Sequence, residues 1–273
     1  MVPPWRDGGQ SQYIERPVPE PSSSGTAEAR QWALARLHEP LQLDDLAAQA
    51  SLRPPPKRPT HTVDIMNITD MPVDHLAITP SILYFGTPVV LLSTENEDGS
   101  ANLAPISSAW ALGQVVVMGL GSEGQTGRNL AARTDLVINL PEPGQWSAVE
   151  RLAPLTGRDP VPASKGGAFR FEPDKFGAAG LRPEPSEVVR PPRVAGCPVQ
   201  LEARAVRVRP DLSGDFLIVE ARVLRVHADP RIVVPGTQHI DPALWSPLIY
   251  NFRHYFGLGA ELGHSFRSET PRG

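Results

Sequence analysis

Residues 86–140 alternate short apolar runs with glycine-containing turns, and this pattern limits the possible folds more than any other part of the chain. Residues 88–94 are apolar and β-branched, which favours a strand. Asp98-Gly99 follows and predicts a hairpin turn, because glycine adopts a positive φ without steric cost. Apolar runs over residues 114–118 and 136–140 predict two further strands. Short strands joined by tight turns are typical of an antiparallel sheet.

The glycine-rich segment after the third run admits two interpretations. Residues 119–124 match G-x-G-x-x-G, the phosphate-binding pattern of dinucleotide folds, and Glu142 lies where such a fold places its ribose-binding acid. The spacing argues against this fold. The predicted helix over residues 126–133 has only about two turns, whereas a parallel crossover needs about a dozen residues or more. The chain also lacks repeated strand–helix alternation.

The second interpretation is a phosphate site at the start of that short helix. Ser122, Gln125 and Thr126 offer hydrogen-bonding side chains there. The first N–H groups of a helix have no internal partner, and the helix dipole favours an anion beside them. Arg128 adds a charge-assisted contact if it faces the same side. We therefore predict that this turn binds a phosphate group, with Thr126 capping the helix.

Several short motifs, taken in order, resemble the flavin reductase-like family. The resemblance covers about residues 75–260 and includes residues 98–110, Ser122, Thr126, Asn129, Asn139-Leu140, Lys175-Phe176, Gly180-Leu181, residues 198–202 and residues 255–259. It implies an FMN-binding split β-barrel that forms a homodimer, with one FMN per subunit near the interface. The implied reaction is hydride transfer from NADH or NADPH to FMN, and the reduced flavin would serve a separate monooxygenase or a bound acceptor.

Two other functions remain compatible with this resemblance. One is a flavin-binding protein whose FMN serves another oxidoreduction and is never released. The other is a transcription regulator that senses flavin through the barrel, which requires the N-terminal segment to bind DNA.

Residues 102–108 are the best site for the flavin ring under the resemblance. A flavin needs hydrogen-bond partners at its pyrimidine edge and a flat apolar surface beneath its rings. Pro105 has no backbone N–H, so at this position there is no donor that a ligand would have to satisfy. Trp110 either walls the site or belongs to the barrel core. The predicted cofactor contacts are Asn102, Leu103, Ala104, Pro105, Ser107, Ser108, Trp110, Gly121, Ser122, Gln125, Thr126, Arg128 and Asn129.

Catalytic and metal-binding residues are less well indicated. The seven histidines show no H-x-x-x-H spacing, so no metal site is predicted. His254 lies in an aromatic run that the resemblance places near the flavin ring or the nicotinamide, and it is the one catalytic candidate. Cys197 is expected to be a buried small apolar residue, and Ser107-Ser108 lack a nucleophile elbow.

The N-terminal 62 residues form a predicted extension that is separate from the barrel. Residues 27–52 have the spacing of a helix pair and resemble the start of the helix-turn-helix domain in the arabinose-regulator family. A proline-rich linker, residues 53–62, follows where a recognition helix would be needed. Nucleic-acid binding is therefore not expected.

Composition agrees with a barrel that has an appendage. The 273 residues suffice for one good core, 31 prolines favour loops and short strands, and the net charge of −4 implies no pull toward nucleic acid or membrane. A single cysteine, with no apolar stretch long enough to span a membrane, predicts a cytoplasmic protein.

The second half of the chain predicts the rest of the sheet. Residues 199–209 alternate apolar and polar side chains, residues 211–215 form a turn, and residues 216–227 form a long strand. We further predict a strand over residues 232–234 and short helices over residues 146–155, around residues 174–177 and in parts of 241–255. The predicted fold is mainly β (α+β): an antiparallel split β-barrel of Greek-key type over residues 63–263, with short peripheral helices and a mobile tail over residues 264–273.

Overall fold

The computed structural model describes residues 75–266 and residue 268. The predicted helix pair, the proline-rich linker and most of the predicted tail lie outside the described residues. Among the described residues, no helix is long and apolar enough to cross a membrane.

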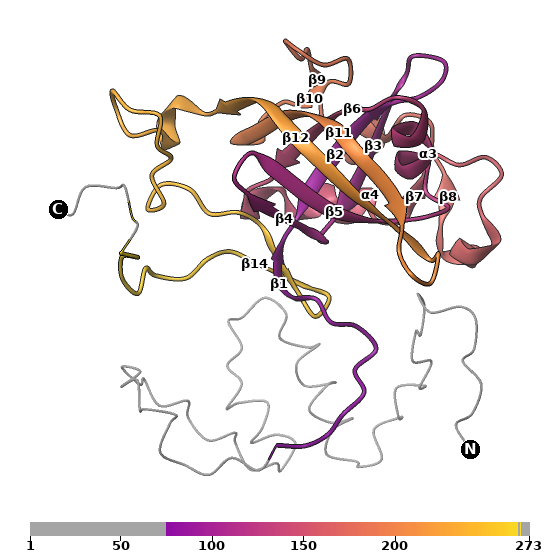
Figure 1. Cartoon of the computed structure of the whole chain (residues 1–273), viewed down its shortest axis with the longest axis horizontal. Coiled ribbons are helices and arrows are strands. Elements are labelled where there is room, and N and C mark those ends of the chain that lie inside the picture. The colour runs from indigo at the N-terminus through magenta and orange to yellow at the C-terminus, as the bar shows by residue number, and fades with distance from the viewer. Residues whose placement is uncertain (1–74, 267, 269–273) are drawn as a thin grey trace, which may run out of the picture. The chain divides into compact units, whose positions relative to one another are not determined.

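One curled sheet dominates the structure (Figure 1). It has seven strands, and every neighbouring pair is antiparallel. In order across the sheet the strands are β3 (Ala101–Ile106), β2 (Val90–Glu95), β6 (Asp135–Leu140), β11 (Val199–Pro210), β12 (Phe216–Ala228), β5 (Val115–Gly121) and β4 (Ala109–Leu112). This arrangement confirms the predicted antiparallel split barrel and excludes the parallel crossover of a dinucleotide fold.

The hairpin of β11 and β12 forms the centre of the sheet. Its pairing shifts register after Glu202 and after Ala205. Such bulges bend a strand and increase its twist, which lets two long strands follow the curvature of a barrel.

Apolar side chains on alternate positions supply two cores, because successive residues of a strand point to opposite faces. Val90 and Leu92 of β2 belong to the barrel core, together with residues of β5, β6, β11 and β12. Val89 and Leu91 point the other way, into a second core under the helices. Cys197 is buried in this second core, as predicted.

Three short α-helices cover the barrel: α3 (Gln125–Ala132), α4 (Trp146–Leu152) and α5 (Lys175–Ala179). The side chain of Asp174 caps α5 by accepting a hydrogen bond from the Gly177 N–H, and Gly180 ends the helix with a φ of 68°. Short 3-10 turns precede α4 (Pro143–Gln145) and α5 (Ala163–Ala168). The peripheral strands are β7 (Leu155–Thr156), β8 (Arg170–Phe171), β9 (Pro183–Glu184) and β10 (Arg193–Val194).

The C-terminal part of the barrel differs from its prediction in two places. Residues 232–234 are not a strand: a 3-10 turn, Pro230–Ile232, is capped by Asp229 and followed by one isolated bridge. Residues 241–255 contain no helix. They form β13 (Ile249–Asn251) and β14 (His254–Phe256), which build a second sheet with β1 (Phe85–Pro88). In this segment β13 pairs with both β1 and β14, and Pro247 would in any case interrupt a helix.

Candidate flavin site

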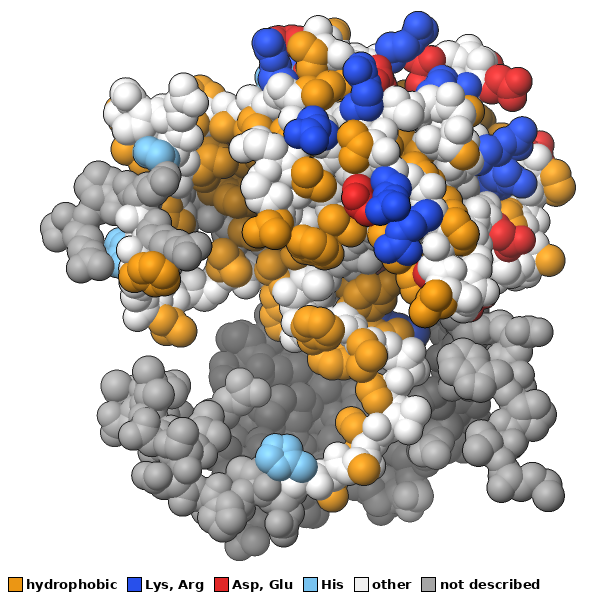
Figure 2. Space-filling view, in the orientation of Figure 1, with side chains coloured by type: hydrophobic (Ala, Val, Ile, Leu, Met, Phe, Trp, Pro, Cys, Tyr) orange, Lys and Arg blue, Asp and Glu red, His pale blue; other side chains and the backbone are white. Residues whose placement is uncertain are grey.

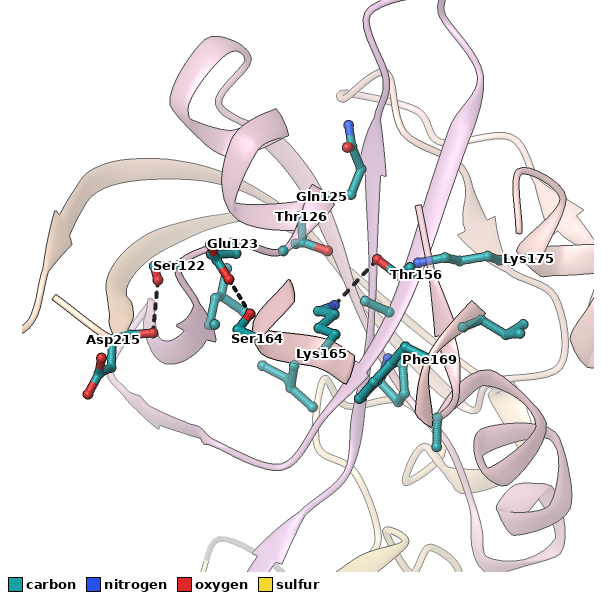
Figure 3. Close-up of a pocket in the computed structure, with 18 residues that line it drawn as sticks. Ser122, Glu123, Gln125, Thr126, Thr156, Ser164, Lys165, Phe169, Lys175 and Asp215 are labelled. Atoms are coloured by element: carbon teal, nitrogen blue, oxygen red, sulfur yellow. Dashed lines mark hydrogen bonds between the residues drawn. The ribbon is translucent and has the colours of Figure 1, made fainter. Parts of the chain in front are cut away.

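A cavity of about 730 Å³ lies beside the β5–α3 turn (Figure 3). Strand β3 and the end of β5 form one wall, and the segment between α4 and α5 forms the other. Its lining residues are Ala104, Pro105, Ile106, Leu120, Gly121, Ser122, Glu123, Gly124, Gln125, Thr126, Ala153, Leu155, Thr156, Ser164, Lys165, Phe169, Lys175 and Asp215.

The start of α3 lacks a side-chain cap. The cap position is Gly124, not Thr126, and no side chain accepts a hydrogen bond from the first turn. The first N–H groups of the helix are therefore available for an external acceptor. A Cβ atom on Gly124 would lie 3.2 Å from the Gly121 carbonyl oxygen, so this tight turn favours glycine there. Thr126 is instead the second residue of the helix and is buried.

A network of buried amides and hydroxyls lies directly behind the cavity. Asn102 Nδ2 donates to Thr126 Oγ1 at 3.0 Å and to Thr94 Oγ1 at 3.2 Å. Asn129 Nδ2 donates to the same Thr94 oxygen at 3.0 Å, and its Oδ1 accepts from Gln125 Nε2 at 2.8 Å. These bonds hold α3 on strands β2 and β3 and fix the rotamer of Thr126.

Lys175 brings a buried positive charge to the same network. Its side chain is 4 % exposed, and Nζ donates to Asn102 Oδ1 at 3.0 Å. Among the described residues, no carboxylate lies within ion-pair distance of this ammonium group. Burial, with a smaller contribution from the charge of Lys165, lowers the pKa of Lys175 to about 8. An isolated buried cation of this kind is costly unless an anion accompanies it.

Lys165 lines the same cavity, and its ammonium group points toward Thr156 (Figure 3). Its Nζ donates to Thr156 Oγ1 at 3.4 Å and lies 5.0 Å from the centre of the Phe169 ring. Burial lowers the pKa of Lys165, and the nearby Glu123 carboxylate opposes this shift.

The carboxylates of the cavity lie at its exposed rim. Glu123 accepts a hydrogen bond from Ser164, and Asp215 contributes its backbone oxygen to Ser122 Oγ at 3.0 Å. Both acids are exposed, whereas Lys175 is buried. The interior of the cavity is thus positive and rich in donors, while its rim is acidic.

A second cavity of about 320 Å³ adjoins the first. Pro105, Ile106, Gly121, Ala153 and Phe169 line both. The second cavity is further lined by Ile82, Tyr84, Val89, Ser107, Ser108, Gly119, Val149, Tyr250, Arg253 and Tyr255. Ser107 and Ser108 therefore lie on the second cavity, and the Ser108 hydroxyl is already bonded to the Gly119 oxygen at 2.6 Å.

The remaining predicted contacts lie away from both cavities. The Leu103 side chain is buried in the second core, and Trp110, at 58 % exposed, is neither core nor a wall of either cavity. Arg128 and Asn129 line a separate polar groove behind α3, which Asn102 also reaches. His254, the predicted catalytic candidate, is exposed and lines neither cavity.

Sequence reasoning gave no binding role to Lys165, Lys175 or Arg253, and it placed the aromatic run of the C-terminal hairpin near the flavin only through the family resemblance. Lys175 follows the helix-capping Asp174 and precedes the buried Phe176, and this position between a cap and the core was the available signal. Lys165 lies in a 3-10 turn and Arg253 in the turn between β13 and β14, and no local sequence pattern marked either residue. No cluster of potential metal ligands occurs among the described residues.

Comparison with known proteins decides the family. The family model described as flavin reductase like domain matches residues 82–259. The chain belongs to the flavin reductase like family. An uncharacterized Bacillus subtilis protein, YdfE, is 46 % identical over 195 residues, which are 71 % of this chain and 94 % of that protein.

The fold of this flavin reductase like protein is also found in solved structures. Flavoredoxin of Desulfovibrio vulgaris superposes with a TM-score of 0.59 at 19 % identity, over 72 % of this chain and 100 % of that one. Nitrilotriacetate monooxygenase component B from Bacillus cereus superposes with a TM-score of 0.57 at 18 % identity, over 71 % of this chain and 100 % of that one. Family membership supports a flavin-related oxidoreductase activity.

Proposed function

We propose that the larger cavity binds FMN and that the protein uses it to pass electrons from NADH or NADPH to free flavin or to another acceptor. The observation that carries this proposal is the buried Lys175, which lacks an acidic partner among the described residues and faces a cavity with free helix N–H groups. A phosphate group supplies the missing anion and accepts from all of these donors.

The lining residues fit the two ends of FMN separately. Thr126, Lys165 and Lys175 would hold the phosphate group, because they bring a hydroxyl and two ammonium groups to one part of the cavity. The apolar wall of Ala104, Pro105 and Ile106 would contact the flavin ring. A volume of about 730 Å³ lies within the range of pockets that bury a ligand of this size.

Bound FMN supplies the redox chemistry, and the protein supplies position and electrostatics. The helix N-terminus and the lysines fix one end of the molecule. The β3 wall excludes water from one side of the cavity, and the second cavity leaves another side accessible to a second reactant.

A homodimer is part of this proposal. Large apolar side chains are exposed on β4, including Trp110 and Leu112, and on β12, including Leu224 and Val226. Figure 2 shows hydrophobic side chains gathered on the face that carries β4 and β1. Exposed apolar area of this kind marks an interaction surface, and a second copy of the chain is the occupant that we propose. The similarity to component B of nitrilotriacetate monooxygenase supports a separate monooxygenase as one acceptor of the reduced flavin.

The test compares FMN with riboflavin, which lacks the phosphate group, on wild type and Thr126→Val. Removing the hydroxyl loses a hydrogen bond to a charged group, so FMN should bind roughly 10- to 100-fold more weakly. Riboflavin affinity should stay nearly unchanged. Thr134→Val is the matched control, because Thr134 is exposed and lines neither cavity.

Two outcomes would contradict the proposal. If wild type binds FMN and riboflavin equally well, the cavity does not recognise a phosphate group. If purified wild type binds no flavin by fluorescence or calorimetry, the cavity has another ligand. Anaerobic addition of NADH or NADPH to the FMN-loaded protein then tests the reaction, through loss of the flavin absorbance.

A further inference from the structure

The second cavity has a wall of three tyrosines: Tyr84, directly before β1, and Tyr250 and Tyr255 of β13 and β14. The rings of Tyr84 and Tyr250 meet edge to face with centres 5.5 Å apart, and those of Tyr250 and Tyr255 are 5.3 Å apart. The Tyr255 hydroxyl donates to the Glu150 carboxylate at 2.9 Å, and the backbone N–H of Phe252 donates to the backbone carbonyl oxygen of Tyr84. These bonds fix the aromatic wall in place. A fixed aromatic surface favours a planar aromatic ligand.

Arg253 is the one cation among the described residues that line this cavity. No carboxylate of the described residues lies within ion-pair distance of its guanidinium group, and none lines the cavity. Glu150, the acid on the tyrosine wall, is bonded to Tyr255 and is not a lining residue. The guanidinium group is therefore free to pair with an anionic group of a ligand.

The backbone at Arg253 is strained. The turn between β13 and β14 has two residues, and both have positive φ: 44° at Phe252 and 68° at Arg253. Such turns normally contain Asn-Gly, because other residues rarely adopt this conformation. Retaining two large side chains here costs stability, and strain of this kind is concentrated at ligand sites.

We propose that the second cavity binds a planar aromatic molecule carrying an anionic group, and that Arg253 determines this specificity. The proposal rests on FMN in the larger cavity, because the shared wall of Pro105, Ile106 and Phe169 then places the aromatic ligand beside the flavin. A volume of about 320 Å³ accommodates one or two rings and is too small for a whole nicotinamide dinucleotide. The ring and anion can belong to a free aromatic acid or to the nicotinamide end of a dinucleotide.

The experiment measures binding of 2-naphthoate and of the uncharged 2-naphthamide to the FMN-loaded full chain by calorimetry. We expect wild type to prefer the acid, Arg253→Gln to lose at least about tenfold in affinity for it, and Arg253→Lys to retain part of it. Arg222→Gln is the matched control, since Arg222 is exposed on β12 and lines neither cavity. FMN affinity is measured for every variant, so failure of the flavin site is recognised separately.

A third variant, Arg253→Gly, distinguishes a ligand role from a structural one. It relieves the strain at positive φ, so its melting temperature should rise while its affinity for 2-naphthoate falls as in Arg253→Gln. With NADH as the ligand, a parallel loss in Arg253→Gln identifies the dinucleotide as the source of the aromatic anion, and an unchanged affinity identifies a free acid. Equal binding of acid and amide by wild type, or full 2-naphthoate affinity in Arg253→Gln, overturns the proposal.

Discussion

Replacing Lys175 with methionine should change how the stability of the protein depends on pH. Burial lowers the pKa of Lys175 from 10.5 to about 8. The unfolded chain therefore binds more protons than the folded chain between these two values, and the free energy of unfolding should rise with pH across that window. The shift corresponds to about 3 kcal/mol, which is the cost of keeping the buried ammonium group charged below pH 8.

The comparison must be made between two proteins, because other groups act in the opposite direction. Burial raises the pKa of Cys197 to about 12, and it also raises the pKa values of Tyr250 and Tyr255. Stability from these groups is lost as the pH rises above their unfolded-state values. They are present in both wild type and Lys175→Met, so their effect cancels in the difference.

Urea unfolding at intervals from pH 7 to 10.5 gives this difference. We expect the free energy of unfolding of wild type, relative to that of Lys175→Met, to rise by about 3 kcal/mol over this pH range. The steep part of the rise should begin near pH 8. At pH 7 the variant is relieved of the buried charge, but it leaves Asn102 Oδ1 without a donor, which costs about 1–3 kcal/mol and is independent of pH. A difference that stays constant with pH would refute the assignment of a buried, unpaired cation.

The same titration should appear in FMN binding, since an anion next to Lys175 favours its charged form. FMN affinity of wild type should fall as the pH rises from 8 to 9, by up to about tenfold per pH unit, while riboflavin affinity stays flat. Fluorescence titration measures both, and Lys175→Met should remove the pH dependence.

Two further predictions concern residues that support the site and the sheet. In Gly157→Ala the new Cβ would lie 2.8 Å from Asn102 Oδ1, so Asn102 should move away from Lys175, and FMN should bind on the order of tenfold more weakly in a fluorescence titration; unchanged affinity would show that the network does not position the lysine. Glu202 accepts hydrogen bonds from the N–H groups of residues 187–189 and contacts His227 Nε2 at 2.6 Å, so Glu202→Gln should lose about 1–3 kcal/mol in urea unfolding at pH 7. Burial alone raises the pKa of Glu202, but these bonds outweigh it and lower the pKa, so the loss should shrink as the pH falls below about 4.

Local patterns predicted most strands of the barrel, because the signal for each strand is contained within a few consecutive residues. The alternation over residues 199–209 and the long run after the turn at residue 211 became β11 and β12, and the Asp98-Gly99 turn joins β2 to β3. These signals can be read locally because successive side chains of a strand point to opposite faces, so the order of residues alone determines which face each one occupies.

The site was harder to predict because its decisive contacts are remote in sequence. Lys175 reaches Asn102 across 73 positions, and nothing local to either residue indicates the pair. The C-terminal hairpin was mistaken for partial helix for a related reason. Its turn is Phe252-Arg253, which lacks the Asn-Gly signal, and its packing partner is β1 far upstream.

The chemistry of the amide network explains why the cavity should select an anion. Lysine can only donate hydrogen bonds, so the Asn102 atom facing Lys175 must be its oxygen, and its NH₂ group must face Thr94 and Thr126. The Thr126 oxygen therefore acts as an acceptor toward Asn102, and no described residue accepts its hydrogen, which remains available to the cavity.

The groups that this network presents to the cavity are donors: the Thr126 hydroxyl, the remaining Lys175 hydrogens and the first N–H groups of α3. A neutral ligand with mixed donors and acceptors leaves some of them unpaired, at a cost of about 1–3 kcal/mol each. A phosphate group has only acceptors in its dianionic form and can satisfy them together. If the cavity binds FMN as proposed, its discrimination against riboflavin should depend on the orientation of one buried amide, Asn102. Lys175 on one side of this amide, with Thr94 and Thr126 on the other, determines that orientation.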